Sequence, residues 1–397
     1  MTHRPVQQQG GLGARWRSLT RYLPEHGWSV EVISARQGPS AIEFPDDARS
    51  GASARTALRP RVMGRLGRLG APVFGVVGLR PEALPPSMLW VPRGALELRR
   101  HVAKRSPDAV LATGPPMAAL LAARLVGGRG LPPLVVEMRD LWAGNPYYDA
   151  GGHLLGAAED WVFTRARSIV AATPEAAEDL RGRHPRHAAR IVEITNGFEP
   201  ELLERRAASP AGRAPPLSII HSGTLTPERP LTPLLQVLAQ EPYRSRVRLV
   251  LHGYLSPGSA AEIAASTGPE VDVVPPSGWA DAIERIAATD AALVTQGRQA
   301  GDATAVAAKV YEYLALGKPV LCLTDGGATE ALLRRLGADR FSARLDQPET
   351  IRAALDRLLE PLPLPLAPER VAGYDRRRLA GRMAEVLEAA ANVVASR

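Results

Sequence analysis

Short aliphatic runs alternate with longer alanine- and leucine-rich segments along most of the chain, and this alternation restricts the fold more than any other feature. Such runs lie at residues 29–34, 109–112, 134–137, 168–171 and 191–194, and again at 217–221, 247–251, 271–274, 291–294 and 319–323. Strands separated in this way by helical segments usually form parallel sheets covered by helices. The sequence therefore predicts an α/β fold with two similar halves.

The length of 397 residues is too great for one ordinary hydrophobic core and predicts two domains. Residues 205–216 are rich in proline, glycine and alanine and lack periodicity, which predicts a linker. We expect a first domain over residues 1–204, a second over 217–375, and a terminal helix over 376–397 that packs back toward the first. Because ligands of parallel sheets bind at the carboxyl ends of strands, the site is expected in a cleft between the domains.

Composition excludes several classes of protein. The one cysteine, Cys322, lies in an apolar run, so neither a disulfide framework nor a cysteine-based zinc site is expected, and this usage fits a reducing cytoplasm. No apolar run approaches the length that spans a bilayer. The net charge of +8 and pI near 10.0 favour anionic partners, but no nucleic-acid recognition motif accompanies them. We expect a cytoplasmic protein that binds no nucleic acid.

Positive charge is concentrated in residues 51–105, which hold eleven Lys or Arg and two Glu, interleaved with leucine, valine and phenylalanine. Such a stretch is suited to peripheral contact with an anionic membrane on its cytoplasmic face. Arginine enrichment from a GC-rich genome, placed on a solvated loop, explains the same pattern equally well. Composition does not choose between these two interpretations.

The most specific motif is the segment AKVYEYLALGKPVL at residues 308–321, which predicts a charged helix running through a glycine into a buried strand. Lys309 and Glu312 lie three residues apart, so they share one face near the helix N-terminus, where backbone N–H groups favour an anion. A phosphorylated ligand would fit there. The alternative is a surface ion pair, which contributes little to stability.

Two glycine motifs predict further phosphate contacts. Gly223 ends a predicted strand and permits close backbone approach, while Arg229 downstream has a guanidinium that can clamp a diphosphate through two hydrogen bonds. Near the start of the chain, Gly11 and Gly13 precede a predicted helix that ends near Gly27. Glycines there let backbone N–H groups approach a phosphate or an acceptor.

The segment Glu137-Met138-Arg139-Asp140-Leu141-Trp142 follows a predicted buried strand, at the edge where catalytic groups gather. Asp140 is a candidate for orienting or deprotonating an acceptor hydroxyl, and Arg139 for meeting an anionic group. The alternative for both residues is a structural ion pair that holds the following loop.

These motifs resemble those of glycosyltransferase family 4, retaining nucleotide-sugar enzymes of the GT-B fold. The family pattern Lys-x-x-Glu-(Tyr/Leu)-x-Ala-x-Gly-x-Pro-Val is matched at every position from Lys309 to Val320. The resemblance implies two Rossmann-like doubly wound domains facing a cleft, and transfer of a sugar from a nucleoside diphosphate to a hydroxyl acceptor with retention of configuration. It further implies that Lys309, Arg229 and Gly223 meet the donor diphosphate and Glu312 the ribose.

No metal and no cofactor are expected. The chain has no Asp-x-Asp, His-x-x-x-His or Cys/His cluster, and the cations at Arg229 and Lys309 are available to neutralise a leaving diphosphate.

Two positions depart from the family pattern. Residues 1–9 offer only Val6 as a strand-type apolar residue where family members begin with a hydrophobic strand, so the first strand is expected to be missing or truncated. Counting back from Glu312, the first acid of the family's Glu-x7-Glu pair is Thr304, with Asp302 as a candidate substitute. These departures keep two alternatives open, namely a non-catalytic partner subunit and a nucleotide-sugar epimerase of the same fold.

Overall fold

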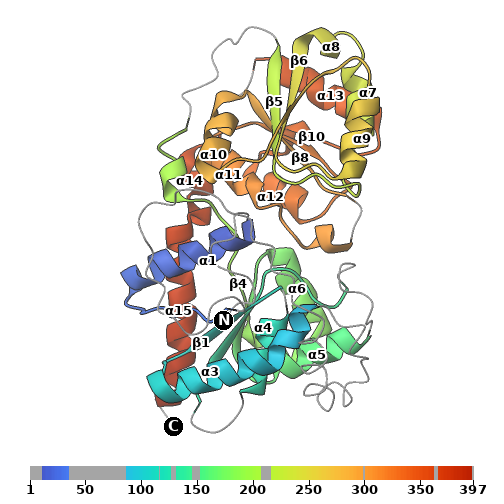
Figure 1. Ribbon diagram of the computed structural model, residues 1–397. Coiled ribbons are helices and arrows are strands. Elements are labelled where there is room, and N and C mark those ends of the chain that lie inside the picture. Colours follow the sequence, from blue (N-terminus) through green and yellow to red (C-terminus); the bar gives the residue numbers. More distant parts are fainter. Residues whose placement is uncertain are drawn as a thin grey trace.

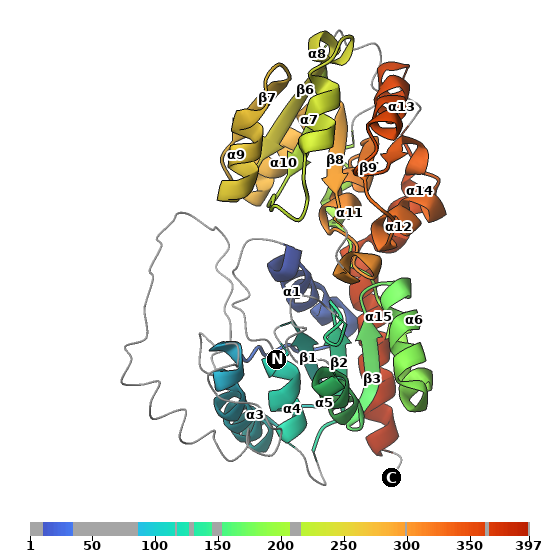
Figure 2. The ribbon, with the colours of Figure 1, turned by 90° about the vertical axis from the view of Figure 1, so that its right-hand side faces the viewer.

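The computed structural model describes residues 11–34, 86–115, 117–126, 131–144, 153–206, 216–297, 300–361 and 365–395. Two α/β domains are stacked, each around its own sheet, and the long C-terminal helix runs along the first domain (Figures 1 and 2). Both sheets are entirely parallel. This confirms the fold class predicted from the alternation of strands and helices. Residues 1–9, where the family's first strand is expected to be missing or truncated, lie outside the described residues, as do most of the basic stretch and most of the linker.

The first sheet has the order β1-β2-β3-β4. Its strands are β1 (Val110–Gly114), β2 (Leu134–Met138), β3 (Ala166–Ala171) and β4 (Ile191–Glu193). The helices around it are α1 (Gly11–Tyr22), α3 (Val91–Arg105), α4 (Ala118–Leu125), α5 (His153–Phe163), α6 (Pro174–Arg183) and α15 (Arg376–Ala395), with shorter turns η1 (Leu23–His26), η3 (Pro86–Trp90), η5 (Pro185–Arg190) and η6 (Pro200–Leu202). Val136 packs in the core shared with α3 to α6, while its neighbour Val135 packs with α1 and α15. Both faces of the sheet are therefore covered, as a parallel sheet requires.

The second sheet has the order β10-β9-β8-β5-β6-β7. Its strands are β5 (Leu217–Ser222), β6 (Val247–His252), β7 (Glu270–Val274), β8 (Ala291–Thr295), β9 (Val320–Leu323) and β10 (Ser342–Ala343). The helices are α7 (Thr232–Leu238), α8 (Tyr243–Arg246), α9 (Pro257–Ala265), α10 (Trp279–Ala288), α11 (Lys309–Ala315), α12 (Ala328–Leu336), α13 (Pro348–Leu359) and α14 (Pro368–Val371), with turns η7 (Ala300–Ala303), η8 (Asp339–Phe341) and η9 (Ala372–Tyr374). Ile219 and Ile220 are buried in separate cores on the two faces. Strands β6 and β7 are added on one side of β5, and β8, β9 and β10 on the other. The topological switch point therefore lies between β5 and β8, where ligands are expected to bind.

Two details differ from the sequence prediction. Residues 29–34 do not form a strand, although Val32 and Ile33 are buried. Val32 packs against Trp16 of α1, so burial by a neighbouring helix accounts for an apolar pattern that resembles a strand. The short strand β10 carries no pattern of its own, since two residues are too few to show alternation.

The chain passes between the domains twice, and the two passages pair with each other. Phe198 N donates to Tyr374 O at 3.0 Å, and Arg376 N donates to Phe198 O at 3.0 Å. A β-carbon at Gly197 would lie 2.0 Å from Tyr374 O, so only glycine allows this close approach. Asn196 and Gly197, a residue pair typical of turns, thus lie where the two interdomain passages contact each other.

Glu199 fastens this crossing to the first domain. Its carboxylate accepts hydrogen bonds from Ser18 Oγ at 2.7 Å and Tyr22 OH at 2.8 Å of α1, and from Arg376 Nη1 at 2.9 Å of α15. Burial alone would raise the pKa of Glu199, but Arg376 and the bonds from Ser18 and Tyr22 lower it. Helices from opposite ends of the sequence are therefore held by one ionised group.

We expect Gly197→Ala to destabilise the protein strongly, because the added methyl group meets a backbone carbonyl that is itself hydrogen-bonded. The cost is expected to reach about 3 kcal/mol, typical of overpacking at a rigid contact. Gly182→Ala is the matched control, since a β-carbon there meets nothing within 4 Å and alanine favours the helix. Thermal unfolding of both variants checks this. Equal midpoints would show that the crossing is not tightly packed.

Candidate active site

The candidate site lies at the carboxyl ends of β5 and β8, where the strand order reverses. Gly223 follows β5 directly, with φ of +130°, a backbone conformation that favours glycine. A β-carbon there would lie 3.0 Å from Lys309 Nζ. Lys309 is the first residue of α11, so the structure brings together two residues that the sequence separates by more than eighty positions.

Lys309 is half-buried and contacts a buried histidine, His221, with Nζ 2.9 Å from His221 Nε2. Burial and the nearby Arg229 lower the pKa of Lys309 to about 7, and Glu312 opposes this only partly. Burial, Lys309 and Arg229 lower the pKa of His221 well below its usual value, so the imidazole is neutral and can accept a hydrogen bond from the ammonium group. Arg229 and the protonated Lys309 therefore carry positive charge at this site, which Glu312 offsets only in part.

Lysine is rare in this chain, and its use is informative. Of the 49 Lys and Arg residues, only Lys104, Lys309 and Lys318 are lysines. Lys318 is buried and donates to Ala287 O at 2.7 Å, which satisfies a carbonyl at the end of α10. Lys309 has no such carbonyl role. A lysine ammonium group loses its proton readily when it is buried. It is therefore suited to a site that becomes fully charged only when an anion binds.

Glu312 lies on the next turn of α11 and accepts a hydrogen bond from Trp279 Nε1 at 2.9 Å. Burial raises the pKa of Glu312, while the Trp279 bond and Arg376 oppose the rise. Glu312 and Lys309 do not form an ion pair, although neither side chain is fully exposed. The surface ion pair considered from the sequence is therefore not what the structure contains.

Several site residues escaped sequence analysis. His252, at the end of β6, bridges Ser222 Oγ and Ser277 Oγ, each at 3.0 Å from an imidazole nitrogen. Tyr313 OH accepts a bond from Ser222 N at 3.0 Å. Trp279 lies 33 residues before Glu312 and has no motif that connects the two. Such pairs arise only when strands β5, β6 and helix α11 converge, so no local signal could have found them.

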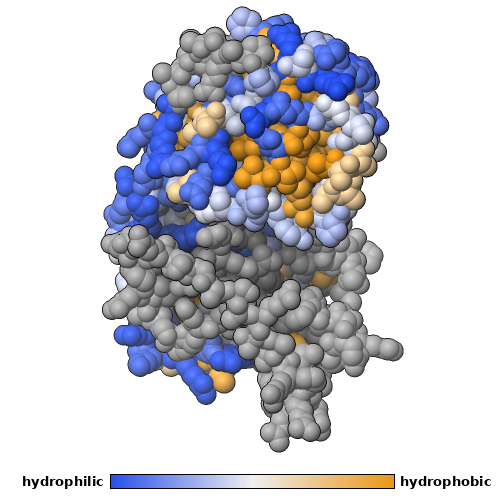
Figure 3. Space-filling model, turned by 45° about the horizontal axis from the view of Figure 1, so that its top comes forward, coloured by the Kyte–Doolittle hydropathy of each residue, from blue (hydrophilic) through white to orange (hydrophobic). Residues whose placement is uncertain are grey.

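Apolar side chains accompany this polar edge. Tyr254 is 57% exposed and Trp279 is 39% exposed, and both follow the carboxyl-end loops of the second sheet. Figure 3 shows that apolar surface gathers on one face of the second domain. Of the two rings, Trp279 contacts Glu312, so an exposed aromatic side chain lies at this site, where it is suited to an organic ligand with a charged end.

The loop before α11 carries the positions that differ from the family pattern. Thr304 O accepts a hydrogen bond from Thr173 Oγ1 of the first domain at 2.6 Å. Asp302 Oδ1 lies 3.5 Å from Gln296 Nε2, which also donates to Ala305 O at 2.8 Å. Asp302 is therefore held beside the end of β8 by Gln296, and Thr304 uses its backbone to join the domains.

The Thr173 contact joins the carboxyl ends of the first sheet to a loop of the second domain. Thr173 follows β3, whose carboxyl end lies beside those of β1, β2 and β4 in the same parallel sheet. Arg139 and Asp140 follow β2 at that edge. The carboxyl edge of the first sheet therefore faces the loop that leads into Lys309.

Arg139 is buried and donates to the carbonyl oxygens of Gly114 and Pro115. Behind it, the fully buried Glu137 accepts from Arg15 Nε at 2.7 Å and Thr113 Oγ1 at 2.5 Å. Burial alone would raise the pKa of Glu137, but Arg15 and Arg139 lower it. The contacts of Arg139 hold it against the backbone that follows β1. They orient the loop that carries Asp140, which is half-buried and lies at the edge of the sheet.

Gly11 and Gly13 lie in the first turn of α1, because the helix begins at Gly11 rather than after the glycine motif. Arg15, one turn further on, is anchored to Ile194 O at 2.8 Å and to Glu137. The N-terminus of α1 is thus fixed against the carboxyl edge of the first sheet, at the end of the domain nearest the second domain (Figure 2).

Two kinds of feature are absent from the described residues. No group of three or more His, Cys, Asp and Glu side chains is placed to hold a metal ion in the described part of the chain. None of the described helices is long and apolar enough to cross a membrane.

The first domain is similar to a known family. Residues 10–197 match the family described as "Glycosyl transferase 4-like domain". This part of the chain is similar to glycosyl transferase 4-like domains. The resemblance noted from sequence motifs is thereby confirmed for this half. No curated protein sequence matches the chain significantly.

Solved structures extend the comparison over both domains. A glycosyltransferase from Rickettsia africae has a TM-score of 0.65 at 12% identity, covering 98% of this chain and 97% of that chain. The Anabaena protein HepE, solved with UDP and glucose, has a TM-score of 0.57 at 15% identity over 100% and 99%. A UDP-forming trehalose-phosphate synthase from Burkholderia xenovorans has a TM-score of 0.59 at 12% identity over 98% of each chain. These likenesses extend over both domains and show the GT-B fold.

We expect the Lys309 amine to titrate near pH 7. Acetylation of lysine requires the neutral amine, so the rate of labelling at Lys309 should reach its plateau with a midpoint near the pKa of about 7, far below the ordinary 10.5. Mass spectrometry resolves this easily because the chain has three lysines, of which Lys104 is exposed.

Arg229→Gln removes a positive neighbour and should move the Lys309 midpoint upward, whereas Arg244→Gln, an exposed change on α8, should not. An unchanged midpoint in Arg229→Gln would show that the two cations do not share a site.

Proposed function

We propose that this protein is a glycosyltransferase that moves a sugar from a nucleoside diphosphate to a hydroxyl acceptor with retention of configuration. The observation that carries the proposal is that Lys309 lies against Gly223 at the end of β5, close enough to Arg229 for the two charges to repel. This site lies at the point of the second sheet where ligands of such folds bind. The family of the first domain and the GT-B architecture support the same class of reaction.

The donor diphosphate would occupy the space beside Gly223. A bound diphosphate would offset the repulsion between Arg229 and Lys309, and Lys309 would regain its proton. The neutral His221 would then accept a hydrogen bond from the Lys309 ammonium group. As the glycosidic bond to phosphate breaks, both cations stabilise the charge that develops on the leaving group. Glu312, oriented by Trp279, is placed to accept hydrogen bonds from ribose hydroxyls.

The acceptor would approach from the first domain. Asp140 lies on the carboxyl edge of that sheet, and its loop is fixed by Arg139 and the buried Glu137. We assign Asp140 to orienting the acceptor hydroxyl and Arg139 to positioning. In the retaining reaction that we propose, the departing phosphate takes the acceptor proton on the face from which it leaves, so bond breaking and bond making share one side of the sugar.

Lys309→Ala is expected to weaken binding of the nucleotide sugar by about 10-fold to 100-fold, because a charge-assisted hydrogen bond contributes about 1.5–3 kcal/mol. The measurement is the thermal midpoint against a panel of UDP-, GDP-, TDP- and ADP-linked sugars, since ligands of the native state raise it. Lys104→Ala, which removes an exposed lysine, is the matched control. Equal shifts in the two variants would contradict the donor site.

Asp140→Asn is expected to lower turnover by about 100-fold or more while leaving donor binding unchanged, as for loss of a group that acts on the acceptor. Release of nucleoside diphosphate with and without an acceptor measures this. Release that requires an acceptor distinguishes a transferase from an epimerase. Donor binding with no turnover under any acceptor would favour the non-catalytic alternative, which the threonine at position 304 keeps open.

A further inference from the structure

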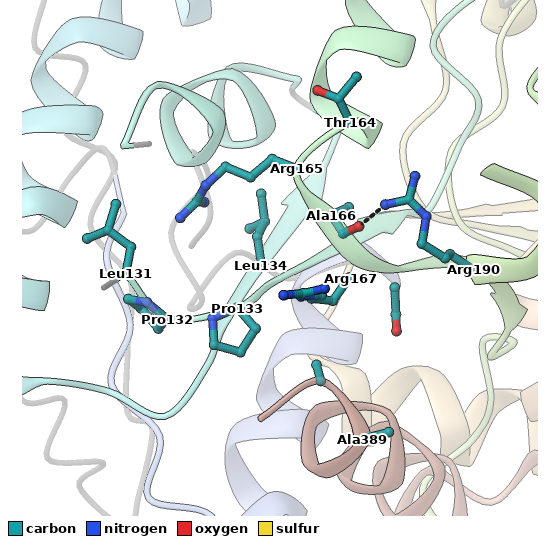
Figure 4. Close-up of a pocket in the computed structure, with 12 residues that line it drawn as sticks. Leu131, Pro132, Pro133, Leu134, Thr164, Arg165, Ala166, Arg167, Arg190 and Ala389 are labelled. Atoms are coloured by element: carbon teal, nitrogen blue, oxygen red, sulfur yellow. Dashed lines mark hydrogen bonds between the residues drawn. The ribbon is translucent and has the colours of Figure 1, made fainter. Parts of the chain in front are cut away.

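A second basic site lies at the opposite end of the first domain. A pocket of about 540 Å³ opens at the amino ends of β2 and β3. It is lined by Leu131, Pro132, Pro133, Leu134, Thr164, Arg165, Ala166, Arg167, Ser168 and Arg190, together with Ala389 and Ala390 of α15. Figure 4 shows the three arginines around it. Because Arg139 and Asp140 follow the carboxyl end of β2, the pocket is separated from the candidate active site by the length of the sheet.

The local backbone presents one of these arginines to the pocket. In the pairing of β2 with β3, Leu134 is opposite Ala166 and Val135 is opposite Ser168, so Arg167 is an extra residue in β3. A bulge of this kind turns a side chain away from the regular alternation. Arg167 is exposed and has neither a hydrogen-bond nor an ion-pair partner within the described parts of the chain.

The other two guanidinium groups are anchored by backbone rather than neutralised. Arg165 Nη1 donates to Ala123 O at 3.3 Å, and Arg190 donates to Ala166 O, as Figure 4 shows. Carbonyl oxygens fix the direction of a guanidinium but do not cancel its charge. No Asp or Glu lines the pocket, and none of its arginines has a carboxylate partner among the described residues. Burial and then Arg167 and Arg186 lower the pKa of Arg190, so two arginines of the pocket lie close enough to repel each other. Burial also lowers the pKa of Arg165, where the neighbouring charge is that of Arg124, outside the pocket.

We propose that this pocket binds a phosphorylated ligand at a site distinct from the donor cleft. Three guanidinium groups with open donors match the several oxygen atoms of a phosphate better than a single carboxylate. The volume is that of a small-molecule site. Phosphate on a free metabolite and phosphate in a lipid headgroup share this chemistry, and the experiment separates them. A ligand here would also contact α15, the helix whose first residue, Arg376, bonds Glu199 at the crossing between the domains.

The test uses the full chain carrying Lys309→Gln and Arg229→Gln, which removes the cations of the donor cleft and leaves the second pocket intact. Inorganic pyrophosphate is titrated into this protein by calorimetry. Arg165→Gln with Arg167→Gln is then added and should weaken binding at least 10-fold. Arg99→Gln with Arg100→Gln, two exposed arginines of α3, removes the same charge elsewhere in the domain and should leave binding unchanged.

The lipid arm measures cosedimentation of the same proteins with phosphatidylcholine vesicles that contain phosphatidylglycerol. Loss of pyrophosphate binding in the pocket variant assigns the site to a free phosphorylated ligand. Loss of vesicle binding in that variant alone assigns it to a headgroup. If the pocket variant and the α3 variant behave alike with both probes, the proposal is wrong. Should the double change prevent folding, Arg167→Gln alone serves, since that side chain makes no contact that the fold requires.

Discussion

The crossing between the domains depends on one half-buried carboxylate. Glu199 is held ionised by Arg376 and by hydroxyl groups of α1, so helices from the two ends of the sequence meet at the point where the chain leaves the first domain. Loss of one partner of such a pair leaves a buried charge unbalanced, which is far more costly than loss of a surface pair. The relative position of the two sheets, and hence of everything placed on their facing edges, depends on this junction and on the close contact at Gly197.

Charge is handled differently on the two sides of the cleft. In the first domain, the buried Glu137 is fully satisfied by Arg15 and Thr113, and the result is a rigid edge. In the second domain, Arg229 and Lys309 lie close together, and Glu312 offsets their charge only in part. Burial and the repulsion from Arg229 therefore lower the pKa of Lys309. A network in which acids and bases balance stabilises a loop. Neighbouring positive charges repel each other, and a bound anion removes that repulsion. The arginine pocket at the far end of the first sheet is likewise lined by positive charges without acidic partners among the described residues. We therefore propose that it is a binding site.

The helices and strands followed from local pattern with few errors, because parallel strands buried on both faces are continuous apolar runs. Residues 29–34 were misjudged because packing against Trp16 buries the same residue types that a strand would. At the site, Lys309, Glu312, Gly223 and Arg229 could be named from sequence since each belongs to a recognisable motif. Trp279, His252 and Tyr313 could not, because their partners come from other strands and helices.

The sequence by itself determined the α/β class, the two halves, and the residue types available for binding an anion. These properties depend on the order of apolar and polar residues and on glycine and proline at turns, all of which are local. Only the tertiary structure decided that Lys309 lies against His221 rather than paired with Glu312, that Arg139 is occupied by carbonyl groups, and that three arginines surround one pocket. The physical reason is that burial and electrostatic repulsion depend on distances through space, which residues remote in the chain set only when the sheets are assembled.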